Sequence, residues 1–139
     1  MGTNIRAEIS EKNKYWINKH RHYELKHFCL QYPSWKKKYA DAVDSCIASS
    51  LFERISSSYN PSDLTAKCAM RKAYYSERIN LIESAAMEAD EELYIYILKA
   101  VTEGLSYTYL KSKLEIPCSR DTFYDRYRRF FWLLNKSRN

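Results

Sequence analysis

Glycine and proline are scarce in this chain, which has two glycines and three prolines among 139 residues. An all-β fold needs many tight turns, and these two residues are the usual material for turns. Helices joined by short loops need few of them. The scarcity therefore predicts an all-α fold, and the hydrophobic periodicity divides it into five to six helices.

Cysteine pairs and long apolar runs are also missing. The four cysteines are scattered without a CxxC pair, at Cys29, Cys46, Cys68 and Cys118. No uninterrupted apolar run approaches the ~20 residues of a membrane span, and no apolar signal segment precedes the basic N-terminal region. These absences predict a cytoplasmic protein with free, mostly buried thiols and no membrane contact.

Motifs for catalysis are absent too, since the chain contains no GxxxxGK[ST], GxGxxG or GxSxG pattern. The acidic group at Glu88, Asp90, Glu91 and Glu92 reads as a helix end followed by an N-terminal cap, rather than as an acid/base pair. We therefore expect no enzymatic activity and no cofactor.

A possible metal cluster is formed in sequence by His20, His22, His27 and Cys29. Ligands that share a metal on one helix must lie three or four residues apart. His20 and His22 point about 200° apart on a helix, and His27 and Cys29 do the same. Only a break in the helix would bring them together, so we expect no metal site here.

Charge is unevenly distributed along the chain, whose net formal charge is +6. Residues 9–38 carry eight Lys or Arg against two acids, residues 105–139 carry eight against three, and residues 51–104 carry six against nine. Two basic ends around an acidic middle suit a protein with a polyanionic partner. Ordinary solvated helix faces are the alternative explanation.

The N-terminal part is predicted to be a flexible arm at 1–13 followed by a helical platform at 14–88, which is a possible oligomerisation region. Helical periodicity begins at Trp16, and Pro33 suits the first turn of a new helix. One face of that helix carries Trp35, Tyr39, Ala42, Val43, Cys46 and Ile47. The serine-rich residues 49–62 are expected to form a loop and subdomain boundary. A third helix then runs from Ser62 or Asp63 to about Glu88.

Residues 90–139 are predicted to form a helix-turn-helix. A helix starts near Asp90 and ends at Gly104, a short one follows from Ser106 to about Leu114, and Ser119 caps the last helix, which reaches about Asn135. One side of the last helix is an apolar stripe of Phe123, Tyr127, Phe130, Phe131 and Leu134. The opposite side carries Asp121, Asp125, Arg128, Arg129 and Trp132, with Tyr124 and Arg126 on the flanks.

A helix with one buried side and Arg, Asp and Tyr on the other meets the requirements of a DNA-recognition helix. Arginine can pair with guanine, aspartate can accept from cytosine, and a capped helix start can hold a phosphate. We expect the base-reading side to consist of Ser119, Arg120, Asp121, Tyr124 and Arg128. The expected phosphate contacts are Arg126, Arg129, Lys111 and Lys113, with Lys36, Lys37 and Lys38 as a second phosphate contact. An amphipathic basic helix that only packs is the alternative.

The segment EGLSYTYLKSKLEIPCSRDTFYDRYRRFFWLL resembles the DNA-binding region 4 of sigma-70-type factors. It is more similar still to small phage- and prophage-encoded sigma-like transcription regulators of Firmicutes, and that resemblance extends through KNKYWINKHRHYELKHFCLQYPSWKKKY and DLTAKCAMRKAYYSERI. The chain departs from the sigma pattern in its turn, where Pro117 and Cys118 intervene between Ile116 and Ser119.

The resemblance implies a transcription regulator of phage origin that binds double-stranded DNA. A homodimer is expected as well, because one short helix reads few base pairs. The alternative is a phage-encoded interaction protein that uses the same basic surface to bind host RNA polymerase, another host protein or a nucleoprotein complex.

Overall fold

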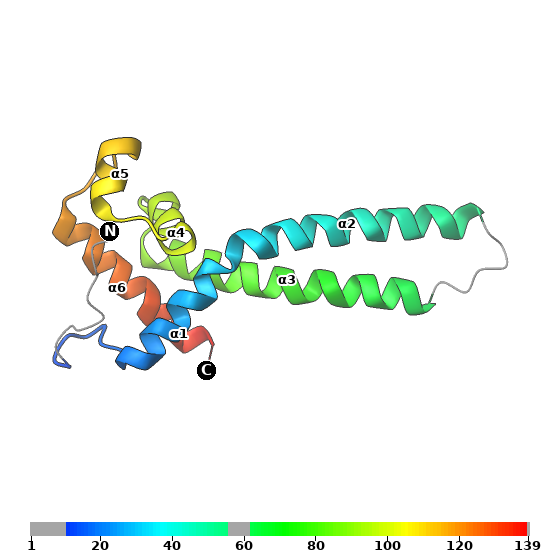
Figure 1. The fold of residues 1–139 in the computed structure, drawn as a ribbon. Coiled ribbons are helices and arrows are strands. Elements are labelled where there is room, and N and C mark those ends of the chain that lie inside the picture. The colour runs from blue at the N-terminus through cyan, green and yellow to red at the C-terminus, as the bar shows by residue number, and fades with distance from the viewer. Residues whose placement is uncertain (1–10, 56–61, 139) are drawn as a thin grey trace. The chain divides into compact units, whose positions relative to one another are not determined.

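The computed structural model describes residues 11–55 and 62–138, which are predominantly helical (Figure 1). Within these ranges there are six helices and no strand: α1 (Lys19–Leu30), α2 (Tyr32–Ile55), α3 (Ser62–Ala89), α4 (Tyr94–Glu103), α5 (Tyr107–Leu114) and α6 (Arg120–Ser137). The predicted all-α fold is confirmed. None of the helices in the described residues combines the length and the apolar character needed to cross a bilayer.

The chain divides into two compact units. The first takes in residues 1–32 and 81–139, of which 11–32 and 81–138 are described, and the second takes in residues 33–80. The predicted boundary between a platform at 14–88 and a helix-turn-helix region at 90–139 is therefore not the division of the structure. Helix α1 packs with α4 and α6, because its buried Leu25, Phe28 and Cys29 share a core with the apolar stripe of α6.

In the second unit α2 and α3 lie side by side, with the Cys46 thiol hydrogen-bonded to that of Cys68. Trp35 and Ala42 are buried, as predicted for their helix face. Ile47, predicted on the same face, is instead 55% exposed and lines an open groove. Two packed helices bury only a narrow strip of each, so the edge of a wide apolar face remains outside.

Two helix ends in the N-terminal half of the chain differ from the prediction. Helix α1 begins at Lys19, where the Asn18 side chain accepts from the His20 N–H, and not at Trp16. Helix α2 continues to Ile55, so residues 49–55 are helical although a loop was predicted over 49–62. Serine lowers helix propensity by only about 0.5 kcal/mol, which is too little to end a helix by itself. Residues 56–61 and 1–10 of the predicted arm lie outside the described residues.

The region from α4 to α6 has the helix caps that its sequence predicts. Gly104 has φ 71° and ends α4, the Ser106 hydroxyl accepts from the Tyr109 N–H at the start of α5, and the Ser119 hydroxyl accepts from the Thr122 N–H in α6. Helix α4 itself begins at Tyr94 rather than near Asp90, whose carboxylate closes a turn over residues 91–93. The sequence pattern thus located every element of this region.

The residues that end α4 and α5 provide a matched test of backbone strain. Glu115, which ends α5, has φ 52°, the left-handed conformation that Gly104 adopts at the end of α4. Glu115→Gly is expected to raise the free energy of unfolding by about 0.5–1 kcal/mol, because glycine adopts this conformation without steric cost. Gly104→Ala is expected to lower it by about 1 kcal/mol. Urea titrations of both variants check the pair, and shifts in the same direction would contradict the strain argument.

Candidate nucleic-acid interface

Helix α6 is anchored by its apolar stripe. Phe123, Tyr127, Phe130, Phe131 and Leu134 are all buried, as predicted, and Leu133 is buried in addition. The Phe131 ring lies 4.7 Å from that of His22 in α1, and the Phe123 ring lies 5.8 Å from that of Tyr107 in α5. Contacts to two other helices fix the rotation of α6 about its own axis, and so decide which side chains face outward.

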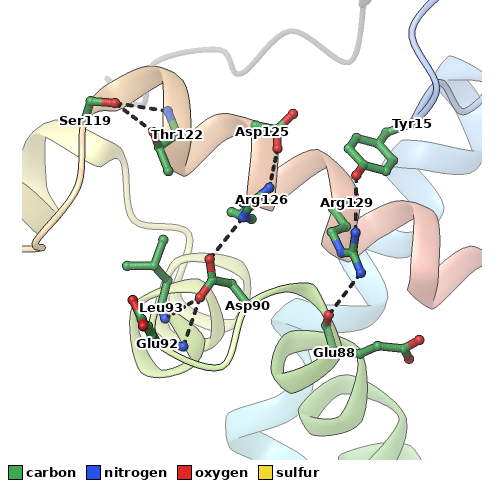
Figure 2. A network of polar contacts seen from close by, with 10 residues as sticks. All are labelled: Tyr15, Glu88, Asp90, Glu92, Leu93, Ser119, Thr122, Asp125, Arg126 and Arg129. Carbon is green, nitrogen blue, oxygen red and sulfur yellow. Dashed lines mark hydrogen bonds and ion pairs between the residues drawn. The ribbon is translucent and has the colours of Figure 1, made fainter.

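Asp90 anchors α6 to the turn that precedes α4 (Figure 2). One carboxylate oxygen accepts from the N–H groups of Glu92 and Leu93, at 2.9 and 3.0 Å. The other accepts from Arg126 Nε at 3.0 Å, while Arg126 Nη1 donates to Asp125 at 2.7 Å. The hydrogen bond to Asp90 raises the pKa of Arg126. The sequence pattern indicates Asp90 only as a cap, because its bond to a residue 36 positions away leaves no local pattern.

Arg129 is also engaged within the protein (Figure 2). Its Nη1 donates to the Tyr15 hydroxyl at 3.4 Å and its Nη2 to the Glu88 carbonyl oxygen at 3.5 Å. Arg126 and Arg129 were both predicted as phosphate contacts, but in this structure each guanidinium group instead joins α6 to a neighbouring segment. The helical wheel placed Arg129 opposite the apolar stripe and Arg126 on a flank, and it could not show what packs there.

Arg128 is less firmly held within the protein than Arg126 and Arg129. The side chain is half-buried, and its Nε atom is buried with no hydrogen-bond partner among the described residues. Because a buried donor without a partner costs free energy, Arg128 has an unmet need for an acceptor. It keeps its place on the outer side of α6 as a partly accessible cation.

The first turn of α6 is the freely exposed part of the predicted base-reading side. Ser119, Arg120 and Asp121 are all exposed. Arg120 Nη2 donates to the Thr108 hydroxyl at 3.0 Å, and its guanidinium lies 5.3 Å from the ring centre of Tyr107. These contacts hold Arg120 across the gap between α5 and α6 without covering it.

Tyr124 supports the same surface from one turn further along α6. Its hydroxyl accepts from the Tyr107 N–H at 3.4 Å, and its ring lies 6.0 Å from the Arg120 guanidinium. Lys111 and Lys113 are exposed in the last turn of α5. The structure therefore brings Ser119, Arg120, Asp121 and Tyr124 together, with the two lysines on the adjoining helix.

The long turn between α5 and α6 is firmly held. The Tyr107 hydroxyl donates to the Cys118 carbonyl oxygen at 2.5 Å, and Ile116 is fully buried. This turn contains Pro117 and Cys118, the two residues by which the sequence departs from the sigma pattern. The Tyr107 bond and the buried Ile116 give this longer turn a defined path from one helix to the next.

Two other groups of residues were singled out from the sequence. Lys36, Lys37 and Lys38 are exposed near the start of α2 and belong to the second unit. The histidine–cysteine group is dispersed along the continuous helix α1, with His22 and Cys29 buried and His20 and His27 exposed. Among the described residues no three His, Cys, Asp or Glu side chains are grouped to hold a metal.

Helix α6 thus has a buried side rich in aromatic residues, arginines in its middle that bond within the protein, and an exposed polar first turn. Helix α5 adds two exposed lysines in its last turn. Backbone N–H groups at such a helix start favour anions, and Arg120 and Asp121 offer a donor set and an acceptor. Comparisons with protein-family models, curated proteins and solved structures find no match to this chain.

Proposed function

We propose that the protein is a DNA-binding transcription regulator that reads duplex DNA with the first turn of α6. The observation that carries the proposal is the exposure of Ser119, Arg120 and Asp121 at the start of a helix whose other side is buried. A helix presented in this way can enter the major groove with its N-terminal residues against base edges. The resemblance to phage-encoded sigma-like regulators supports the same assignment.

Each residue of the surface has a distinct task in this proposal. Arg120 pairs with guanine through two donors, and Asp121 accepts from a cytosine amino group. Ser119 and the neighbouring N–H groups bind a phosphate oxygen, as do Lys111 and Lys113 on α5. Tyr124 holds Arg120 in place by packing beside it. Arg126 and Arg129 orient the helix from within and do not contact DNA.

Selection of bound fragments from a genomic DNA library tests the proposal. The wild-type protein is expected to enrich one sequence motif, and Arg120→Ala is expected to lose discrimination at one base pair by about 1–3 kcal/mol, roughly 5- to 150-fold. Lys99→Ala is the matched control, since Lys99 is an exposed cation on α4 that pairs with Glu103. A variant that kept the wild-type motif and affinity would refute this placement of the base-reading surface.

The same selection bears on the number of copies that bind. If a homodimer binds, the enriched motif contains two half-sites about one helical turn, roughly 10 base pairs, apart. If the protein binds all duplexes alike with a steep dependence on salt, it is instead an interaction protein for a host protein or nucleoprotein complex, using the basic surface without reading sequence.

A further inference from the structure

A second basic surface lies where residues 14 and 15 pack beside the C-terminal half of α6. Lys14 Nζ is 4.9 Å from the ring centre of Tyr15, the rings of Tyr15 and Trp132 are 5.5 Å apart, and Lys136 Nζ is 3.5 Å from the ring centre of Trp132. We call these four residues the lysine–aromatic cluster. The sequence pattern missed it, because its two halves are more than one hundred residues apart in the chain.

The part of α6 beside the cluster carries positive charges only. Residues 128–138 contain four Lys or Arg residues and no acidic residue. Arg129 donates to the Tyr15 hydroxyl, and the pKa of this phenol is lowered by that hydrogen bond and also by Lys14, although desolvation acts in the opposite direction. The positive field that stabilises a phenolate at this position also favours an external anion.

The aromatic rings hold the two ammonium groups rather than offering themselves to a ligand. Lys14 and Lys136 are exposed, whereas Tyr15 is buried and Trp132 is half-buried. An ammonium group held over a ring has less freedom to lose when it binds an anion. Since Lys136 covers one face of Trp132, stacking of a nucleic-acid base there is disfavoured. Phosphate is the ligand that two exposed, preorganised cations fit.

We propose that the lysine–aromatic cluster is a second contact to the DNA backbone, on the flank of the sequence that the first turn of α6 reads. This inference rests on the proposed function. Lys136 lies sixteen residues after Arg120 on the same helix, which is about 24 Å along the axis. A contact this far along the helix lies outside the base pairs that the first turn of α6 reads, so it falls on one side of the motif.

Binding to duplexes of the selected motif, measured over a range of salt concentrations, tests the inference. Lys14→Ala/Lys136→Ala is expected to weaken binding about 5- to 20-fold at physiological salt and to reduce the salt slope by about two, for matching and non-matching duplexes alike. The charge-matched control is Lys67→Ala/Lys99→Ala, which removes two exposed lysines from α3 and α4. Removing the DNA flank on one side is expected to abolish the difference between the double variant and the wild type.

The possible results distinguish DNA contact by the lysine–aromatic cluster from DNA binding by α6. If the double variant matches the wild type in affinity and salt slope, the cluster does not contact DNA, while the assignment of α6 stands. If the wild type binds no duplex, the proposed function fails. Trp132→Leu keeps both charges but removes the ring under Lys136, and a lower affinity at unchanged thermal stability would support positioning by the ring.

Discussion

Replacing Asp90 by alanine is expected to lower the free energy of unfolding by about 2–3 kcal/mol, because two structural roles are lost together. One carboxylate oxygen holds the N–H groups of Glu92 and Leu93, and the other holds Arg126 of α6. Loss of the capping bonds accounts for about 1 kcal/mol. Loss of a partly buried, charge-assisted hydrogen bond accounts for about 1–2 kcal/mol more. Denaturant unfolding, followed by circular dichroism, measures the change.

Asp90→Asn separates the two roles. Asparagine keeps an oxygen that can accept from the N–H groups of Glu92 and Leu93, but it carries no charge to hold Arg126. We expect it to lose about half as much stability as Asp90→Ala, and to lose the sensitivity to salt that the ion pair confers. A loss below about 0.5 kcal/mol for Asp90→Ala would contradict the assignment, because surface substitutions without a structural role fall in that range.

Acid is expected to destabilise the protein through His22. This side chain lies in the core of the first unit, 4.7 Å from the Phe131 ring, and is 8% exposed. Desolvation lowers the pKa of His22 to about 4, and the charge of Lys26 acts in the same direction. The unfolded chain therefore binds a proton more readily than the folded one, since an ordinary histidine has a pKa of about 6.5.

The sign of the pH dependence follows from these two values. The contribution of His22 to stability is complete above about pH 6.5 and is lost as the pH falls through that value toward 4. Between pH 7 and pH 4 the free energy of unfolding is expected to fall by about 2–3 kcal/mol through this group alone. Unfolding titrations across that range measure the total, to which carboxylates also contribute.

His22→Phe isolates the histidine. The variant keeps an aromatic ring next to Phe131 but cannot take up a proton, so its stability should fall less steeply between pH 7 and pH 4. The difference between the two pH profiles of unfolding free energy measures the contribution of His22. Parallel profiles for the wild type and the variant would show that His22 is not protonated on unfolding in this range.

Local sequence patterns predicted the elements that carry the candidate site. The apolar spacing in α6, the serines before α5 and α6 and the glycine after α4 are signals within a few residues of each other, and all of them appear in the structure. The same kind of reasoning placed Arg120 and Asp121 at an exposed helix start. It also predicted a loop over residues 49–55, which are helical, because the lower helix propensity of serine does not by itself end a helix.

What the chain determines by itself is its helical class and the amphipathic design of α6, since both depend on the repeat of the helix and on side-chain polarity within one or two turns. Only the tertiary structure decided which cations remain available to a ligand. The bonds of Arg126 to Asp90 and of Arg129 to Tyr15 and Glu88 join segments 36 to 114 residues apart. The rings of Tyr15 and Trp132 likewise meet from distant parts of the chain. Contacts over such separations depend on how the helices pack, and packing leaves no periodic trace in the sequence.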